Sequence, residues 1–253
     1  MLTILRSTNR RRLVALTLLC LLALAAPAAQ AAPITIDDFS APGSFGGAGV
    51  TLGAVGTTGL VTDGPPLAGV VEGANATRGT TLNFDAGLGT VNLTIGGGDL
   101  SYTSTGTADG SFSLLYDANA TLVIDLTDNA TNNTFGVGVG SNTAGTPVTV
   151  TLTDDALNFF ALTLPTTGGP GDLLFPLAGF TGIDLTQIQS ILISVNPAAG
   201  AGITLTGVVA TPEPASALLW GCISLTLLGH NTLRRRRTRR PEVPTGQAQV
   251  RCQ

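Results

Sequence analysis

Short runs in which apolar and polar residues alternate set the strongest limit on what this chain can fold into. The clearest is 148–153, where Val and Leu alternate with Thr. Successive side chains of a strand point to opposite faces, so one face of such a run enters a core and the other meets water. Similar runs recur along residues 82–205, and no window among them keeps a helical period. The alternation predicts an all-β fold of about ten to fourteen short strands.

Turn-forming residues separate these runs. Gly, Asp, Asn and Pro gather at 63–66, 96–99, 128–129 and 168–171, where they suit chain reversals. Many short strands with frequent turns favour a single β-sandwich of jelly-roll type. The rival fold, a parallel β-helix, needs a repeat of about 20 residues, and the chain shows no fixed period. We expect the core to contain Val148, Val150, Leu152, Ile191, Ile193 and Ile203.

The first 31 residues have the three parts of a secretory signal peptide. Four arginines lie within the first twelve residues, an apolar stretch follows at 13–26, and Ala29-Gln30-Ala31 supplies small residues for signal peptidase. We therefore expect export through the Sec translocon and cleavage near Ala31. The alternative is an uncleaved N-terminal anchor. Either way, residues 32–210 form the exported domain.

A second three-part segment occupies residues 211–240. Pro212-Glu213-Pro214 precedes an uncharged apolar run at 215–233, and a polar tail, 241–253, ends the chain. As a helix the run would span about 28 Å, close to the hydrocarbon thickness of a membrane. Arginines directly after such a span stop transfer and mark the cytoplasmic side, which places the preceding domain outside. These stop-transfer arginines are Arg234, Arg235, Arg236, Arg237, Arg239 and Arg240.

This order of motif, span and arginines resembles the PEP-CTERM sorting signal of exported bacterial proteins. The resemblance implies that a membrane exosortase recognises Pro212, Glu213 and Pro214 and cleaves near them. The protein would then pass from the inner membrane to the cell surface, outer envelope or extracellular matrix. The tail at 241–253 departs from the family, whose chains usually stop soon after the arginines. The alternative is a plain single-span anchor.

The composition of residues 32–211 excludes several functions. One basic residue, Arg78, stands against fourteen acids, which gives a net charge of −13 and argues against nucleic-acid binding. The segment has no His, Lys or Cys, so it can form neither a Ser–His or Cys–His nucleophile nor a disulfide. Carboxylate pairs, as in glycosidases, remain possible catalytic groups. The simplest interpretation of Asp37-Asp38 and Asp154-Asp155 is that they are solvated acids of strands and turns. We therefore expect no catalytic residues and no enzyme activity.

Calcium is the one cofactor that the residues suggest. Asp125, Asp128, Asn129 and Asn132 gather around one turn, and calcium takes oxygen ligands from such loops. The competing interpretation is that these residues form the turn and keep the protein soluble. No other metal or cofactor is expected.

Three short segments resemble jelly-roll domains of the galactose-binding and carbohydrate-binding-module type. They are Ile36–Phe39, Leu173–Phe180 and Ile183–Ile191. The resemblance implies that the opening strand, with its acidic pair, lies near the last strand of the sandwich. It also implies contact with sugars, although aromatic residues, the usual sugar platforms, are scarce in this domain.

Three functions follow from these patterns. The leading hypothesis is a non-catalytic structural or adhesive protein of the envelope or extracellular matrix. The alternative is a carbohydrate-binding module associated with exopolysaccharide, and a secreted hydrolase comes third. The expected partners are signal peptidase, the Sec translocon, an exosortase and extracellular polysaccharide.

Overall fold

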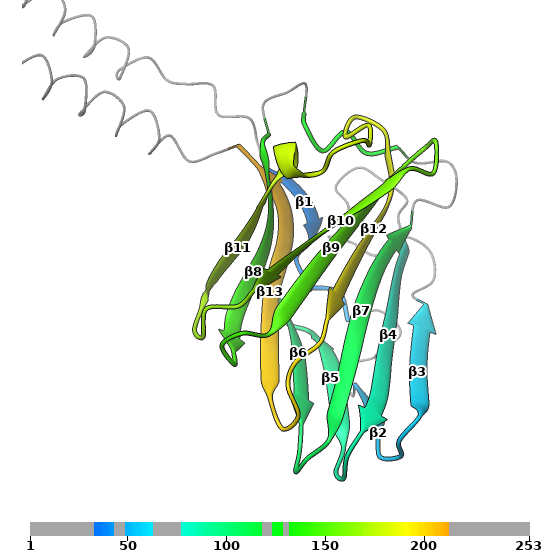
Figure 1. Cartoon of the computed structure of the whole chain (residues 1–253), viewed down its shortest axis with the longest axis vertical. Coiled ribbons are helices and arrows are strands. Elements are labelled where there is room, and N and C mark those ends of the chain that lie inside the picture. Colours follow the sequence, from blue (N-terminus) through cyan, green and yellow to red (C-terminus); the bar gives the residue numbers. More distant parts are fainter. Residues whose placement is uncertain (1–32, 43–48, 63–76, 118–122, 129–131, 213–253) are drawn as a thin grey trace, which may run out of the picture. The chain divides into compact units, whose positions relative to one another are not determined.

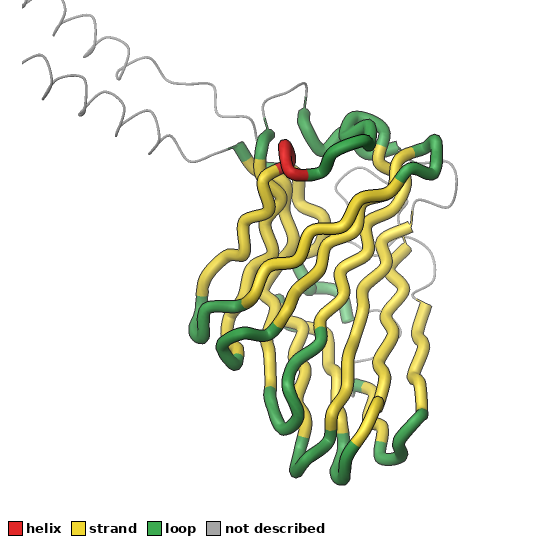
Figure 2. Tube along the Cα trace, viewed as in Figure 1, coloured by secondary structure: helices red, strands yellow, loops and turns green. Residues whose placement is uncertain are grey.

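The computed structural model describes residues 33–42, 49–62, 77–117, 123–128 and 132–212. Within these ranges the chain forms strands joined by turns and one short 3-10 helix, η2 (Leu177–Gly179), as Figure 2 shows. The strands are β1 (Ile34–Asp37), β2 (Val50–Leu52), β3 (Thr57–Thr62), β4 (Thr77–Ala86), β5 (Val91–Gly96), β6 (Asp99–Ser104), β7 (Asp109–Asp117), β8 (Thr134–Asn142), β9 (Pro147–Asp154), β10 (Phe159–Pro165), β11 (Gly171–Pro176), β12 (Ile188–Val195) and β13 (Gly202–Thr211).

The strands form two antiparallel sheets that pack face to face (Figure 1). Sheet A has the order β11-β8-β13-β6-β5-β2, and β1 also pairs with β13. Sheet B has the order β10-β9-β12-β7-β4-β3. The all-β prediction is thereby confirmed, with two antiparallel sheets sharing one core.

Both sheets contribute to that core. The six residues expected to face inward are each at most 1 % exposed. The alternating threonines Thr149, Thr151 and Thr153 are half-buried on the other face of β9. The two-residue period of the sequence therefore identified the inner face of these strands correctly.

The alternating glycines of β8 face outward, while Phe135, Val137 and Val139 enter the core. Side chains of the neighbouring strand β13 fold over them. A Cβ atom placed on Gly138 would lie 2.5 Å from Thr206 Oγ1, and one on Gly140 would lie 2.9 Å from Thr206 Cγ2. The glycines thus make room for the neighbouring strand's threonine, which explains the Gly-Val alternation.

The predicted turns are found where the structure describes them. Gly97 and Gly98 join β5 to β6 with φ values of +69° and +95°, which glycine adopts at little cost. The turn predicted at 168–171 joins β10 to β11. The turn predicted at 63–66 lies outside the described residues.

The first and last strands lie side by side, as the jelly-roll resemblance implied. Ile34 of β1 pairs with Ala210 of β13, and Thr211 ends β13 opposite Thr134. The start of β1 and the end of β13 therefore lie at the same end of the sandwich, which we call the terminal end. The opposite end, which carries the β8–β9 and β12–β13 turns, is the distal end (Figure 1).

Candidate functional site

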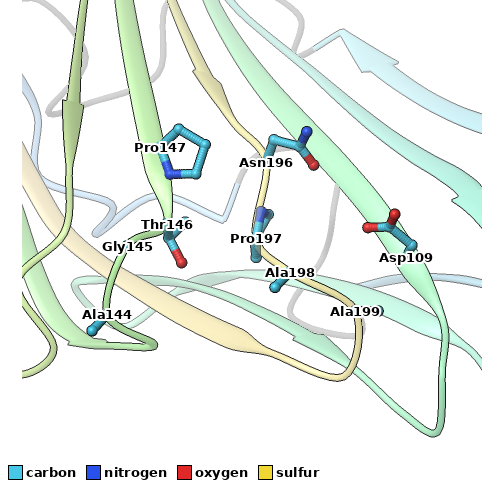
Figure 3. A pocket seen from close by; sticks show the side chains of 9 residues that line it. All are labelled: Asp109, Ala144, Gly145, Thr146, Pro147, Asn196, Pro197, Ala198 and Ala199. Carbon is cyan, nitrogen blue, oxygen red and sulfur yellow. The ribbon is translucent and has the colours of Figure 1, made fainter.

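A hollow of about 390 Å³ opens at the distal end of the sandwich. It lies between the β8–β9 turn and the β12–β13 turn, and Asp109 of β7 borders it (Figure 3). Thr146 and Pro147 contribute from one side, and Asn196 contributes from the other. The backbone N–H of Asn196 donates to the carbonyl of Pro147 at 3.3 Å, which ties the two sides together.

A second hollow, of about 300 Å³, adjoins the first on the outer face of sheet B. Pro147 and Asn196 border both. Ser113, Ser194 and Thr149 lie side by side across β7, β12 and β9, because Ser113 pairs with Ser194 and Ser194 pairs with Thr149. Antiparallel register thus gathers side chains from distant parts of the sequence into one polar row.

Some of these polar groups are held by the protein itself. Thr58 Oγ1 donates to Asn83 Oδ1 at 3.1 Å, Asn83 Nδ2 donates to Ser111 Oγ at 3.4 Å, and Ser111 Oγ donates to Asp85 Oδ2 at 3.0 Å. This chain of bonds runs across β3, β4 and β7 and fixes one wall of the second hollow.

Other polar groups are available to a ligand. Within the described part of the chain, the side chains of Ser113, Ser194 and Asn196 make no hydrogen bond to protein atoms. All three border the hollows and reach solvent. Two hydroxyls and an amide can each both donate and accept, which suits them to the hydroxyl groups of a sugar.

The charge of the surrounding surface restricts the ligand further. Arg78 is the only basic residue in the described ranges, and it is fully buried. Asp109 borders the first hollow and brings a negative charge to it. A polymer rich in carboxylate, sulfate or phosphate would meet repulsion here and no compensating cation, so the site suits an uncharged ligand.

Arg78 instead holds the two sheets together. Its Nη1 donates to Asp37 Oδ2 at 2.9 Å and its Nη2 donates to the carbonyl of Ala41, also at 2.9 Å. The hydroxyl of Tyr116 donates to the same Asp37 oxygen at 2.9 Å. Asp37 comes from β1 of sheet A, whereas Arg78 and Tyr116 come from β4 and β7 of sheet B. The cluster therefore bridges the layers.

The prediction that Asp37 is a solvated acid is wrong. Its side chain is 1 % exposed and lies beside Arg78. Ile36 is buried as well, because the pairing of β1 with β13 is irregular between Thr35 and Asp37 and breaks the two-residue alternation. Burial raises the pKa of Asp37, and the Arg78 guanidinium opposes that rise. Burial and the nearby Asp37 carboxylate raise the pKa of Tyr116. Asp38, the next residue, is exposed as expected.

Asp154 also departs from the expectation of a solvated acid, since it is 2 % exposed. Its carboxylate accepts hydrogen bonds from the backbone and side-chain amides of Asn158, at 2.8 and 3.1 Å, and from the Asp184 backbone at 3.1 Å. Desolvation favours the neutral acid, but these bonds outweigh it and lower the pKa of Asp154. Its role is to cap the β9–β10 connection, and its neighbour Asp155 is exposed.

Two of the candidate calcium residues, Asp125 and Asn132, make structural hydrogen bonds in a shared turn. Asp125 Oδ1 accepts from the backbone N–H and the hydroxyl of Thr127, at 2.8 and 2.6 Å. The N–H of Asn132 donates to the Thr127 carbonyl at 2.7 Å. Asp128 lies in the same turn, and Asn129 is outside the described residues. In the described ranges no three His, Cys, Asp or Glu side chains are grouped to hold a metal. Calcium binding stays a prediction.

Of the predicted sorting motif, the described residues include only Pro212. Pro212 follows β13 directly and is half-buried. Glu213, Pro214, the arginines at 234–240 and the predicted cleavage residues Ala29 and Ala31 lie outside the described residues. None of the helical segments that the structure describes is long and apolar enough to cross a membrane. The apolar run at 215–233 lies outside them too.

No family model matches this chain, and no curated protein matches its sequence. Among solved structures, the family 30 carbohydrate-binding module of cellulosomal cellulase Cel9D-Cel44B from Clostridium thermocellum is similar. It shares 14% identity with a TM-score of 0.40, over 72% of this chain and 99% of the module.

Two further carbohydrate-binding modules are similar at the same low level. The family 11 module of Lic26A-Cel5E from Clostridium thermocellum has 13% identity and a TM-score of 0.36, over 72% of this chain and 95% of the module. The module TmCBM61, solved with β-1,4-galactotriose, has 13% identity and a TM-score of 0.33, over 64% of this chain and 92% of its own. Likeness this distant assigns no ligand to the chain.

Proposed function

We propose that residues 32–210 form a non-catalytic, jelly-roll-like domain of the bacterial envelope or matrix that binds neutral polysaccharide at the two adjoining hollows. The observation that carries this proposal is the set of free polar groups, Ser113, Ser194 and Asn196, on an open face without a cation. An open face admits a polymer chain along its length, and these groups offer hydrogen bonds to sugar hydroxyls. This joins the adhesive role to the carbohydrate-binding alternative.

The expected binding is weak for one domain. Tyr102 and Tyr116 are buried at 1 % exposure, so neither can stack on a sugar ring. Hydrogen bonds to exposed hydroxyls exchange with water and contribute only about 0.5–1.5 kcal/mol each. Retention in a matrix would come from many copies on one polymer, where each bound domain raises the effective concentration of the next.

Affinity electrophoresis of the processed protein tests this function. Gels containing neutral glucans, galactans or mannans should include at least one that slows migration, and gels containing polyuronates should not. The discrimination should persist at low salt, where charge effects are largest. Retardation by polyuronates, or by none of the neutral polymers, would overturn the proposal.

A hydrolase is the weaker candidate. Asp37 is paired with Arg78, and Asp154 is bonded to Asn158 and Asp184. Neither carboxylate borders the two hollows. These contacts support structural roles for both buried acids, and a non-catalytic domain accounts for them most simply.

We further propose that the domain is delivered by the PEP-CTERM signal, with Pro212, Glu213 and Pro214 as the recognition element for an exosortase. The described domain ends at Pro212, directly before Glu213, so little chain separates the folded core from the motif. The hollows lie toward the distal end of the domain, away from the end of β13.

Replacing Glu213 with Ala should leave export intact while uncleaved precursor accumulates in the inner membrane. Mass spectrometry of both termini, in a host with an exosortase, measures this. A mature wild-type surface protein that retains Trp220 and Cys222 would support the single-span anchor instead. This outcome leaves the glycan test unaffected, so the two proposals can fail separately.

A further inference from the structure

The edge strand β10 carries no charged residue. Its sequence is FFALTLP, and among the described strands it pairs only with β9. At the corresponding edge of sheet A, β11 carries the exposed Asp172 and ends with Pro176. Charges and prolines are the common devices by which edge strands avoid pairing with other chains. Within β10 the only such residue is the terminal Pro165.

The hydrogen-bond pattern shows which backbone groups of β10 face away from β9. The N–H of Asp154 donates to the carbonyl of Asn158 on one side of the strand, and the N–H of Thr166 donates to the carbonyl of Thr146 on the other. Residues 158 and 166 therefore both face β9, and so do the even-numbered residues between them. The odd-numbered residues face outward: Phe159, Ala161, Thr163 and Pro165.

Among the described residues, the outward N–H groups of β10 have no hydrogen-bond partner. In the ranges that the structure describes, the backbone N–H groups of Phe159, Ala161 and Thr163 make no hydrogen bond. Pro165 has no N–H. Three donors in a row, spaced two residues apart, form a template for one further antiparallel strand.

The side chains of β10 add an apolar component. Phe160 and Leu162 point toward the interior but stay half-buried, because the sandwich ends at this edge. Phe159, on the other face, is 72% exposed. A strand added at this edge would bury more of all three side chains, and apolar burial favours association.

We propose that β10 is a self-association edge, where a second copy of this chain pairs antiparallel about a twofold axis at Ala161. In this register Ala161 lies opposite the partner's Ala161, and Phe159 lies opposite the partner's Thr163. Every outward N–H then has a carbonyl acceptor, and Pro165 stays outside the paired segment. A register centred on Leu162 would set Phe159 against proline and lose a bond at each end.

Charge and symmetry both point to a second copy as the occupant. Two domains that each carry a net charge of −13 repel over most of their surfaces, and β10 is an edge where no acid would face an acid. The paired strands are self-complementary under the twofold axis, so one edge serves both partners. Sheet B would continue across the axis into the partner's sheet.

Cysteine cross-linking of the full exported chain tests the register. Ala161→Cys is introduced after Cys20, Cys222 and Cys252 are replaced by Ser, so that it is the only thiol. Directly opposed residues in a hydrogen-bonded antiparallel pair have Cα atoms about 5.5 Å apart, which suits a disulfide. Most of the Ala161→Cys protein should run as a disulfide dimer on a non-reducing gel.

Leu60→Cys is the matched control, because Leu60 is exposed on β3, the other edge of sheet B. Its dimer fraction should be at least about fivefold lower. Adding Thr163→Pro to Ala161→Cys should reduce dimer to the control level, since it removes an outward N–H and leaves the backbone bonds to β9. It also removes the exposed hydroxyl contact between Thr163 and Thr149 of β9. Equal cross-linking at positions 60 and 161, or no loss with Thr163→Pro, would overturn the proposal.

A second measurement needs no cysteine. Ala161→Lys places two like charges opposite each other at the axis, whereas Thr151→Lys adds the same charge on β9, directly across from Ala161 within one copy. In sedimentation equilibrium, Ala161→Lys should raise the dimer dissociation constant at least about tenfold and Thr151→Lys much less. Equal effects of the two lysines, or a wild-type chain that stays monomeric, would contradict self-association through β10.

Discussion

The single cation of the folded domain has a structural role. Arg78 pairs with Asp37 where neither side chain meets water, and Tyr116 completes the hydrogen bonding of the carboxylate. Removing one partner of a buried pair leaves an uncompensated charge in a medium that solvates it poorly. The pair therefore matters less for the attraction it supplies than for what each member would cost alone.

Arg78→Met should accordingly lower the free energy of unfolding by about 3–5 kcal/mol, since it leaves Asp37 buried and unpaired. The double variant Arg78→Met/Asp37→Asn should recover part of this loss, because the charge is then gone. Urea denaturation measures both. A double variant as unstable as the sum of its two single variants would mean that the residues act independently.

Asp154 gives the domain an acid-sensitive contact. Hydrogen bonds from Asn158 and Asp184 lower its pKa in the fold below the ordinary 3.8. A carboxyl whose pKa is depressed by folding stabilises the fold above its unfolded pKa, and that stability falls as the pH falls through the folded value. The contribution is therefore complete above about pH 5.

The variant Asp154→Asn should be less stable than wild type at pH 6, and the difference should shrink near pH 2. Denaturant titration at the two pH values measures the change. Asp155→Asn is the matched control, because the neighbouring Asp155 is exposed and should show a much smaller difference. An Asp154→Asn deficit that is equal at both pH values would contradict the ionised contact.

Neither acid could be assigned its role from the sequence. Asp37 and Arg78 are 41 positions apart, and their contact depends on β1 joining sheet A while β4 joins sheet B. The sequence does not distinguish a buried aspartate from an exposed one when the two are adjacent. The two-residue period correctly places Asp154 on the inner face of β9. It fails for Asp37, because the irregular pairing of β1 buries both Ile36 and Asp37.

At the scale of strands, the alternation predicted inner faces well and pairing poorly. Val148, Val150 and Leu152 are buried as expected, because their period depends only on the local run. The insertion of β13 between β8 and β6 depends on contacts distant in sequence, which no local pattern contains. The short helix η2 also lay inside a segment with no helical period.

The glycines of β8 give a prediction at this scale. Gly138→Ala should destabilise the domain by about 1–3 kcal/mol, because its Cβ would meet Thr206 Oγ1 at 2.5 Å. Gly79→Ala on β4 is the matched control, since its nearest neighbour would be 3.8 Å away. Thermal melts of both variants measure the difference. Equal effects would mean that β13 yields easily to the added methyl.

At the scale of the whole molecule, the candidate site comes from topology. Nothing in the sequence distinguishes the polar residues of the site from other polar residues. The strand order β9-β12-β7 brings Ser113, Ser194 and Asn196 to one face. The composition did predict that this face lacks positive charge, because the domain has a single basic residue. Such a face has little to attract a polyanion. The sequence could thus argue against polyanionic ligands, but it could not indicate where the proposed site lies.

At the same scale, the position of the hollows bears on the proposed delivery of the domain by its sorting signal. The hollows lie toward the distal end and β13 finishes at the terminal end, so the described chain ends on the side away from the proposed glycan site. Pairing through β10 would join domains along sheet B and place several glycan sites on one assembly. Such an arrangement favours retention by many weak contacts.

The most direct test removes the free hydroxyls of the site. The double variant Ser113→Val/Ser194→Val should bind the retarding neutral polysaccharide about tenfold more weakly, from two lost hydrogen bonds of about 0.5–1.5 kcal/mol each. Ser101→Val/Thr204→Val removes two hydroxyls from the outer face of sheet A, where these residues are paired. It also removes an exposed hydrogen bond that Ser141 donates to Thr204 at 3.0 Å. It should bind like wild type, with both variants melting near the wild-type temperature. If the sheet B variant keeps full affinity, or both variants lose it equally, the hollows of sheet B are not the glycan site.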